Sequence, residues 1–422
     1  MPVNRDKPAA HTEQFGQKGG SGSPVLSAGS DLAVVVLDNA EELEAHKAEW
    51  QVLADAALEP NVFYEPCCLP PSLRAFGAHS ELRLVLVYAS ALATEQGGVG
   101  AEGANGARAV GQGQLVGFFP LERARPNRRL PVPHLRMWVN DYSYVSTPLV
   151  HSKHAAAVVS AFFRWLEGQS LGSRLVFFEH LPVGGPVQAL LAAEAERPRR
   201  TGYVRERFHR ALLAPDCEAE AYRQRALSRR EQKSFERRRR RLAELGSFEI
   251  ATLTAAEEVD AWCEAYLALE NAGWKGHNGT AFASNPRDTV FFRTMFRQAF
   301  AAGRLSSTAV VSNGQKIAIQ ILLHAGRGAY AYKTTYDESF SSFGPGALLE
   351  FDLIGRTGFH APIGWVDSAA DPENALLNRM WTERRMIENW LVTCDDSLGL
   401  LLSLMPALRW VKRNFRGARL PQ

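Results

Sequence analysis

The stretch from Gly328 to Arg356 reads GAYAYKTTYDESFSSFGPGALLEFDLIGR and predicts a strand, a glycine-rich loop and a helix. Aromatic and β-branched residues recur over 328–336, which is typical of a strand, and the helix is expected over 347–356. The loop from Ser341 to Ala347 contains two glycines, which let the backbone approach a ligand closely. Amides at a helix start attract phosphate, so the loop predicts an anion site. An ordinary strand-to-helix turn with Pro345 near the first helical position is the alternative.

The rest of this half of the chain predicts further strands and helices. Asn313-Gly314 is a strong hairpin signal between two apolar runs. Thr254 precedes Glu257 at the spacing of a capping box, which predicts that Thr254 caps a long helix. The other expected elements are strands over 248–253, 307–311, 316–324 and 364–367, and helices over 289–302 and 379–391.

The first half predicts the same order of elements: a strand, helices, three strands, a helix, a strand and a helix. Strands that alternate with helices and hairpins indicate a mixed α/β (α+β) fold, here duplicated in tandem, each half a mixed central sheet flanked by helices. The expected strands are 31–38, 82–88, 114–121, 135–140, 174–179 and 208–213, and the expected helices are 40–57, 155–167 and 187–195. We therefore divide the chain into a disordered leader (1–30), a first domain (31–215) with a flexible Gly/Ala loop (89–113), a basic helical arm (216–246), a second domain (247–391) and an apolar and basic tail (392–422).

Composition narrows the class of protein. Of 422 residues, 46% are apolar and 22% charged, which excludes a wholly disordered or fibrous protein. A net charge of +3 excludes a uniformly basic coat for nucleic acid, and no DNA partner is expected. Five cysteines form no CxxC pair, which favours a reducing compartment. With no apolar run long enough to span a membrane, we expect a cytoplasmic protein. His151 and His154 lack further ligands nearby, so no metal site is expected.

The arm is strongly basic. Ten Lys or Arg residues and two Glu lie between Arg223 and Arg241, and basic residues recur at every fourth position (225, 229, 233, 237 and 241). Like charges at that spacing repel on a helix, which predicts an anionic partner; a solvated helix on an acidic patch of the protein is the alternative. In the tail, the apolar stretch 398–408 precedes basic residues from Arg409. Such a segment would allow peripheral contact with the inner face of a membrane, or dock back on the protein.

Several segments together resemble the GNAT acyltransferase superfamily, and especially its double-GNAT, BioF-like and CelD-like acetyltransferase domains. The loop after the fourth strand of that superfamily, Gln/Arg-x-x-Gly-x-Gly/Ala, holds the pyrophosphate of acyl-CoA. Here Ser341-x-x-Gly344-x-Gly346 matches both glycines and lacks the leading Gln or Arg. The segments that carry the resemblance are ENAGWKG (270–276), KIA (316–318), YKTTYDE (332–338), GPGALL (344–349), DS (367–368), WTERR (381–385), NDY (140–142) and PLV (148–150).

The resemblance implies an acyltransferase that moves an acyl group, most simply acetyl, from acyl-CoA to an amine or hydroxyl. Acyl-CoA would be a co-substrate and no cofactor would be bound permanently. The acceptor would be a small molecule or a glycan, in polysaccharide or cell-envelope biosynthesis. The same doubled architecture resembles the Fem-type peptidyltransferases, so an aminoacyl-tRNA-dependent transferase is one alternative, and a non-catalytic scaffold of polysaccharide biosynthesis is another. The donor would bind at Ser341, Ser342, Gly344, Gly346 and Ala347, whereas Ser146-Thr147-Pro148 at the matching place of the first domain predicts that this domain has lost donor binding.

Three residues are candidates for catalysis. Glu270 extends the apolar face of its helix four residues after Tyr266, which suits a general base, or it forms a structural pair with Lys275. Tyr336 ends its strand just before the glycine loop, where a tyrosine protonates the leaving thiolate in many GNAT enzymes; a core position is the alternative. Asp367 ends the fifth strand of the second domain, where a GNAT sheet opens for donor and acceptor. It would orient the acceptor or cap a helix.

Strand periodicity predicts which side chains face a cleft. On strand 328–336, Tyr330, Tyr332, Thr334 and Tyr336 should share one face and Lys333 should take the other. On strand 316–324, Gln320 and His324 should lie opposite Ile317, Ile319 and Ile321. They line a cleft if that face meets the other domain; for His324 a hydrogen-bonded core position is the alternative. The candidates for substrate binding are Trp274, Lys275, Gln320, Lys333, Asn140 and Tyr142.

Overall fold

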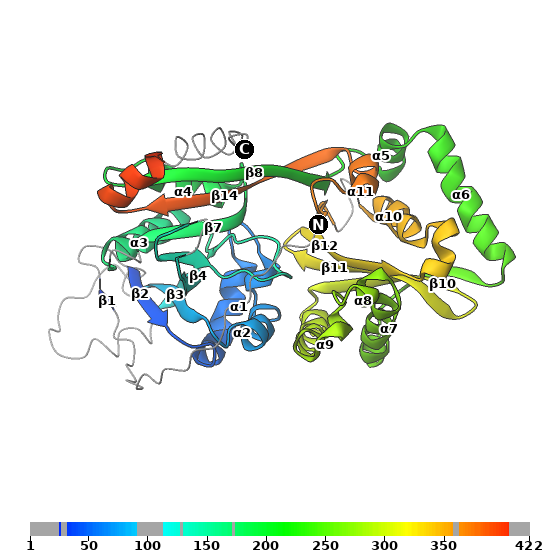
Figure 1. Cartoon of the computed structure of the whole chain (residues 1–422), viewed down its shortest axis with the longest axis horizontal. Coiled ribbons are helices and arrows are strands. Elements are labelled where there is room, and N and C mark those ends of the chain that lie inside the picture. The colour runs from blue at the N-terminus through cyan, green and yellow to red at the C-terminus, as the bar shows by residue number, and fades with distance from the viewer. Residues whose placement is uncertain are drawn as a thin grey trace, which may run out of the picture.

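The computed structural model describes residues 25–26, 32–90, 113–126, 130–170, 174–357 and 363–404. Most of the leader (1–30), most of the Gly/Ala loop (89–113) and the basic end of the tail lie outside the described residues, and so do the predictions made for them. Two α/β halves lie side by side in Figure 1, and two long strands run along the top from one half to the other.

The described residues of the first half form fourteen elements, several of them short. In chain order they are β1 (Val25–Leu26), β2 (Leu32–Leu37), η1 (Glu42–His46), α1 (Lys47–Asp55), η2 (Val62–Tyr64), α2 (Leu69–Phe76), β3 (Glu81–Ala89), β4 (Gln114–Ala124), β5 (His134–Met137), β6 (Leu149–Val150), α3 (Ala155–Glu167), β7 (Leu175–Pro182), α4 (Pro186–Ala195) and β8 (Thr201–Leu213).

Two helices lead into the second half. The elements that follow β8 are α5 (Ala219–Ala226), α6 (Arg229–Glu244), β9 (Phe248–Thr252), η6 (Ala256–Glu258), α7 (Val259–Ala272), α8 (Trp274–His277), η7 (Phe282–Ser284), α9 (Pro286–Ala301), β10 (Leu305–Ser312), β11 (Gln315–Ala325), β12 (Gly328–Tyr336), η8 (Glu338–Phe343), α10 (Pro345–Arg356), β13 (Trp365–Asp367), α11 (Ala375–Met380) and β14 (Glu383–Thr393). Among the described residues, no helix is long and apolar enough to cross a bilayer.

The two halves repeat one topology, which confirms the predicted duplicated mixed α/β fold. Each half contains one parallel pair of strands joined across a helix: β5 pairs with β7 across α3, and β12 pairs with β13 across α10. The other pairs within each half are antiparallel. The strands of the described residues join one mixed sheet in the order β1-β2-β3-β4-β5-β7-β14-β8-β13-β12-β11-β10-β9, with β6 beside β4.

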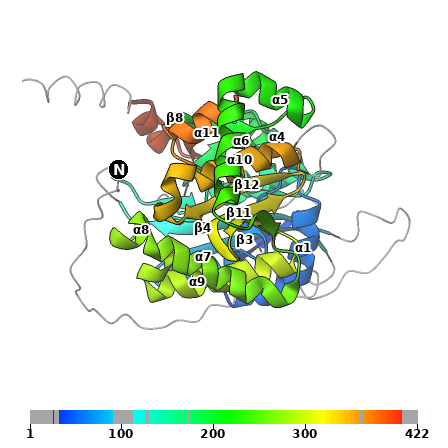
Figure 2. The ribbon, with the colours of Figure 1, turned by 90° about the vertical axis from the view of Figure 1, so that its right-hand side faces the viewer.

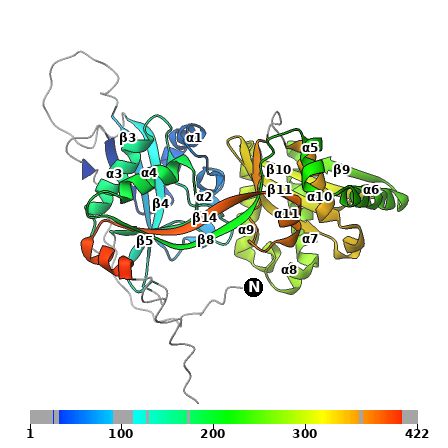
Figure 3. The ribbon, with the colours of Figure 1, turned by 90° about the horizontal axis from the view of Figure 1, so that it is seen from above.

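The halves exchange their last strands. β14 lies between β7 and β8, so it adds to the first half's sheet, while β8 pairs with β13 and adds to the second half's sheet. β8 and β14 also pair with each other from Glu383↔Leu212 to Thr393↔Thr201, and Figure 3 shows them crossing from half to half. Neither half therefore completes its sheet without the other.

The predicted helix over 379–391 is wrong, because α11 ends at Met380 and Glu383–Thr393 is the strand β14. This strand is flanked on both edges by strands from much earlier in the chain, and its apolar residues are packed on both faces. A strand buried on both faces loses the alternation that marks a strand in sequence.

The arm is two helices and not one. α5 ends before Leu227, and Ser228 caps α6 in a capping box with Glu231. The Ser228 hydroxyl accepts a hydrogen bond from the Glu231 amide, and the Glu231 carboxylate accepts one from the Ser228 amide. Arg225 therefore leaves the predicted basic row and forms ion pairs with Asp216 and Glu383. The Ser-x-x-Glu signature of this break was present in the sequence.

The capping box predicted at Thr254 is absent. The 3₁₀ turn η6 begins after Ala255, and α7 begins at Val259 after Glu258, with no side-chain cap at either start. The Thr254-x-x-Glu257 spacing therefore falls before the helix, one turn too early for its side chains to reach the first free amides.

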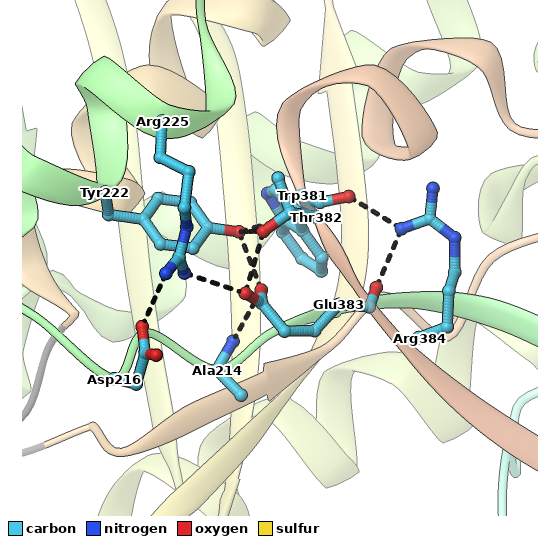
Figure 4. A network of polar contacts seen from close by, with 8 residues as sticks. All are labelled: Ala214, Asp216, Tyr222, Arg225, Trp381, Thr382, Glu383 and Arg384. Atoms are coloured by element: carbon cyan, nitrogen blue, oxygen red, sulfur yellow. Dashed lines mark hydrogen bonds and ion pairs between the residues drawn. The ribbon is translucent and has the colours of Figure 1, made fainter.

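The hydroxyl of Tyr222 fixes α5 to the start of β14 (Figure 4). It donates to Glu383 Oε2 at 2.8 Å and accepts from the Thr382 amide at 2.9 Å. Burial raises the pKa of Tyr222 to about 12, so the hydroxyl remains a donor at neutral pH. Arg225 reaches the same carboxylate from the exposed side. The arm is thus held by a buried polar network as well as by apolar packing.

We expect Tyr222→Phe to lower the free energy of unfolding by about 1–2 kcal/mol, because the Thr382 amide and the Glu383 carboxylate lose a buried partner. Urea denaturation followed by circular dichroism measures this change. Tyr336→Phe is the control, since the Tyr336 side chain is 37% exposed and its hydroxyl deletion should leave stability unchanged. Equal stability of Tyr222→Phe and wild type would show that the network contributes nothing.

Candidate active site

A cavity opens where β12 and β13 separate. The two strands pair only over Gly328–Tyr330 and Trp365–Asp367, and beyond Asp367 the chain turns away through Ala369, which has φ of 50°. We call the gap between the separating strands the fork, and it contains a cavity of about 370 Å³. Its walls come from β12, α8, α10, α11, the segment between β13 and α11, and a loop of the first half. The lining residues are Tyr144, Lys275, Ala331, Tyr332, Lys333, Thr334, Tyr336, Gly346, Glu350, Ser368, Ala369, Ala370, Asn374, Leu376 and Leu377.

A β-bulge decides which side chains enter this cavity. Ile321 pairs with Lys333 and Leu322 with Ala331, so Tyr332 is an extra residue on β12. A bulge interrupts the alternation of faces along a strand. The prediction of one shared tyrosine face is therefore wrong: Lys333 joins Tyr332 on the side of the first half, whereas Thr334 and Tyr336 face α10.

The ammonium of Lys333 lies among four aromatic rings. The distances from Nζ to the ring centroids of Tyr142, Phe282, Tyr144 and Tyr332 are 5.1, 5.5, 5.8 and 5.9 Å. Burial by itself lowers the pKa of Lys333, but Tyr144 and nearby carboxylates outweigh burial and raise the pKa above its ordinary value. Lys333 is therefore a fixed positive charge on the wall shared by the two halves.

Glu270 is buried and fully engaged. Its Oε1 accepts from the Tyr266 hydroxyl at 3.0 Å and from Lys275 Nζ at 2.9 Å, and its Oε2 accepts from the Phe282 amide at 2.9 Å. The pair with Lys275 is the structural alternative considered above. Glu270 therefore positions Lys275, which lines the cavity, and each of its carboxylate oxygens already accepts at least one hydrogen bond within the protein.

Asp367 ties the exchanged strands together. Its Oδ1 pairs with Arg210 Nε of β8 at 2.7 Å, and its Oδ2 pairs with Arg385 Nη1 of β14 at 3.1 Å. The Ala369 amide also donates to Oδ1 at 2.9 Å, and the Asp367 side chain is fully buried. With both oxygens held, Asp367 shapes the fork rather than exchanging protons with an acceptor, and we leave it out of the proposed catalytic set.

Tyr336 lies between the fork cavity and a smaller neighbour. The smaller cavity, about 30 Å³, is bounded by Glu270, Trp274, Lys275 and Glu338 as well as by Tyr336. Trp274 is 56% exposed, and its amide donates to Glu338 Oε1 at 2.7 Å. Tyr336 is 37% exposed and lines both cavities.

The glycine loop leads directly into α10. Gly344 is the N-cap of this helix in a left-handed conformation (φ 59°, ψ 55°), and Pro345 occupies the first turn. Gly346 lines the fork cavity, and Ala347 follows it in the first turn, so amides that lack intrahelical partners lie beside the cavity. Ser341 and Ser342 lie on the exposed 3₁₀ turn η8 before Gly344.

The arm contributes positive charge to this loop. A Cβ added at Gly344 would lie 2.5 Å from Nη1 of Arg238, and the Arg241 guanidinium lies 4.9 Å from the ring centroid of Phe343. Phe235 of α6 stacks on Phe351 of α10 at 4.8 Å, which holds the two helices side by side (Figure 2). Residues far apart in sequence thus combine into one cationic turn at the start of α10.

Two predicted substrate ligands of the first half support a loop instead of lining the cavity. The Asn140 side chain accepts from the Tyr142 amide at 2.7 Å and donates to Ser72. The Tyr142 ring packs on Phe282 at 4.6 Å, and its hydroxyl donates to Asp288 of α9 at 2.7 Å. Tyr142 contributes to the site only as one of the four aromatic rings around the Lys333 ammonium.

Sequence reasoning missed Glu350, the buried acid of the site. Glu350 is 3% exposed on α10, lines the fork cavity, and its Oε1 accepts from Gln320 Nε2 at 2.8 Å. Burial raises the pKa of Glu350 to about 8. The one signal in the sequence was an acid that directly follows the apolar residues 347–349. Gln320 faces away from Ile319 and Ile321, as predicted. The register between β10 and β11 shifts between Val310 and Val311, so Ile317 lies on the same side as Gln320 and not opposite to it.

The part of the chain that contains the loop matches a known family model. Residues 228–358 match the family model of an acetyltransferase (GNAT) domain. Among curated proteins, none matches the chain. Solved structures similar to it include FemX, with 10% identity over 84% of this chain and 98% of that chain and a TM-score of 0.49. A tandem GNAT protein from the clavulanic acid biosynthesis pathway has 15% identity over 86% of this chain and 98% of that chain, with a TM-score of 0.35. The C-terminal domain of a putative lysylphosphatidylglycerol synthetase from Agrobacterium fabrum has 12% identity over 68% of this chain and 84% of that chain, with a TM-score of 0.41. The family match runs from the cap of α6 to just past α10 and so contains Gly344, Gly346 and Glu350.

Proposed function

Because residues 228–358 match the family model of a GNAT acetyltransferase domain, we propose that the chain transfers an acyl group, most simply acetyl, from acyl-CoA to an acceptor in the fork cavity. A GNAT domain implies an acyl-CoA co-substrate. The observation that carries the proposal is the left-handed Gly344 cap, which places the first amides of α10 beside the cavity. These amides and the positive end of the helix would hold the donor pyrophosphate.

Arg238 would supply the charge that the loop itself lacks. The superfamily pattern begins with Gln or Arg, and this chain has Ser341 there. The Arg238 guanidinium reaches Gly344 from α6, and a guanidinium forms paired hydrogen bonds with phosphate oxygens. We therefore assign Arg238 to the donor site, together with the amides of Gly346 and Ala347.

Tyr336 would act at the reacting end of the donor. A Cβ added at Gly346 would lie 3.6 Å from its ring, so the ring stands next to the first turn of α10. When the acceptor attacks the thioester carbonyl, a bond forms from the acceptor to the carbonyl carbon and the carbon–sulfur bond breaks. The Tyr336 hydroxyl would give its proton to the departing thiolate and regain one from the acceptor. Most of the rate enhancement would come from holding the two substrates together in the fork.

Calorimetric titration with acetyl-CoA tests the donor site. We expect wild type to bind with micromolar affinity and Arg238→Ala to bind about 10-fold to 100-fold more weakly, as expected for one charge-assisted hydrogen bond lost. Arg240→Ala is the matched control: Arg240 is exposed on the same helix, and no ion pair engages it within the described part of the chain. No binding of acetyl-CoA or of longer acyl-CoAs would refute the proposed function, and equal losses in both variants would refute the role of Arg238.

A further inference from the structure

Tyr332 and Lys333 present two hydrogen-bond donors on the first-half side of the fork cavity. The Tyr332 side chain lines the cavity and is 3% exposed, and its hydroxyl has no hydrogen-bond partner among the described residues. Lys333 forms no ion pair within the described part of the chain, whereas Lys275 on the same cavity pairs with Glu270. Buried polar groups are normally hydrogen-bonded and buried charges are normally paired. The hydroxyl therefore lacks an acceptor, and the ammonium lacks a counter-ion.

The charge of Lys333 is the uncompensated one at this cavity. Lys275 is neutralised by Glu270, whose Oε1 lies 2.9 Å from Lys275 Nζ. Burial raises the pKa of Glu350 to about 8, so this carboxyl is mostly protonated at pH 7. Lys333 stays protonated at that pH, because its pKa lies above the ordinary value of a lysine. The lining of the cavity thus presents one net positive charge.

We infer that the acceptor substrate carries a carboxylate, and that Lys333 Nζ and the Tyr332 hydroxyl bind it. The inference rests on the proposed function, because it names the chemical class of the second substrate of the fork cavity. A carboxylate has two oxygens that accept hydrogen bonds, so it can take one from the ammonium and one from the phenol. Its charge balances that of Lys333, and such charge-assisted hydrogen bonds are about twice as strong as neutral ones.

The position of Lys333 favours the acceptor over the acyl chain as the source of this carboxylate. The proposed donor site lies at the first turn of α10, beside which the Tyr336 ring stands. The bulge in β12 turns Lys333 away from that helix and toward the rings of Tyr142 and Tyr144 of the first half. A molecule that enters between the halves would meet Lys333, whereas an acyl group held at α10 would approach from the other face of β12.

The aromatic rings around Lys333 make it a more effective ligand than an exposed lysine. Four ring centroids lie between 5.1 and 5.9 Å from Nζ, and the ring faces attract the ammonium. The side chain is therefore already ordered before a substrate binds. Less conformational entropy is lost on binding when the ligating side chain is held in advance.

Binding of a carboxylate that carries no nucleophile tests the site directly on the full chain. Propionate and propionamide are similar in shape and differ in charge. We expect calorimetry to show that wild type binds propionate about 10-fold to 100-fold more tightly than propionamide, as one charged hydrogen bond would give. Lys333→Met should remove this preference, and Tyr332→Phe should weaken propionate binding about 3-fold to 10-fold.

The matched control is Lys153→Met, which removes an exposed lysine of the first half and should bind propionate as wild type does. Equal binding of the two probes by wild type would overturn the inference. So would a preference for propionate that persists in Lys333→Met.

A turnover assay identifies which substrate carries the carboxylate. Thiol release from acetyl-CoA is measured with amino acids and hydroxy acids, each beside its primary amide. We expect kcat/KM to be about 10-fold to 100-fold higher for the acids, mainly through KM, and Lys333→Met should bring the ratio of acid to amide close to one. A merely structural role of Lys333 would lower both rates together and leave the ratio unchanged, which would overturn the inference.

Two further comparisons complete the test. Amides that react as fast as the acids, or no turnover with any acid, would overturn the inference. Succinyl-CoA carries a carboxylate on its acyl chain, so a Lys333-dependent preference for succinyl-CoA over acetyl-CoA, without any preference among acceptors, would overturn the assignment to the acceptor. Propionate binding needs no donor, so its failure while acetyl-CoA binds refutes this inference alone, whereas failure to bind any acyl-CoA refutes the proposed function.

Discussion

Gly344→Val should abolish acyl-CoA binding while the chain remains folded. Gly344 has φ of 59°, a left-handed conformation that costs a β-branched residue about 1–3 kcal/mol. A Cβ at this position would also lie 2.5 Å from Arg238 Nη1 and would push the guanidinium away. The substitution therefore disturbs both proposed phosphate ligands at once, the first amides of α10 and Arg238.

The control for strain is Gly314→Val in the β10–β11 hairpin. Gly314 has φ of 74°, and a Cβ there meets nothing within 4 Å. Both variants should lose similar amounts of unfolding free energy in urea, because both force valine into the left-handed region. Only Gly344→Val should show no heat of acetyl-CoA binding in calorimetry, a loss of at least 100-fold in affinity. Wild-type affinity in Gly344→Val would place the donor elsewhere.

Asp367→Ala should produce the largest loss of stability. Asp367 and Arg210 are 0% and 4% exposed at the side chain, and removing one member of a buried ion pair costs about 3–5 kcal/mol because the other charge is left without compensation. Arg385 loses the same partner. Since these arginines lie on β8 and β14, the substitution would destabilise the exchanged strands that join the halves.

Urea denaturation measures the effect of Asp367→Ala, and Asp371→Asn is the control. Asp371 is exposed in the loop before α11 and should change the free energy of unfolding by less than about 0.5 kcal/mol. Adding Arg210→Met to Asp367→Ala should recover part of the stability, because the uncompensated buried charge is removed. If Asp367→Ala unfolds at the same urea concentration as wild type, the ion pairs do not hold the exchanged strands.

Local sequence was sufficient wherever an element depends on its own residues. The strand Gly328–Tyr336 and the helix Ala155–Glu167 lie where the sequence predicts them. The Asn313-Gly314 turn also forms, with positive φ at both residues. These elements are specified by short-range periodicity and by turn residues, and both signals lie within about ten residues of sequence. The same reasoning placed Gly344 before a helix, but that helix begins at Pro345 and contains Gly346, which the sequence had assigned to the loop.

Tertiary structure decided everything that depends on partners distant in sequence. β14 is a strand because β7 and β8 flank it, although its own residues indicated a helix. The Tyr332 bulge sends Lys333 to the first half's side, and such a shift is set by pairing with β11 rather than by alternation along β12. Arg238 meets Gly344, and Glu350 meets Gln320, across gaps of more than twenty residues. The residue types of the candidate site could thus be read from the sequence, but their partners could not. Charge pairing and burial depend on neighbouring residues that only the folded sheet brings together.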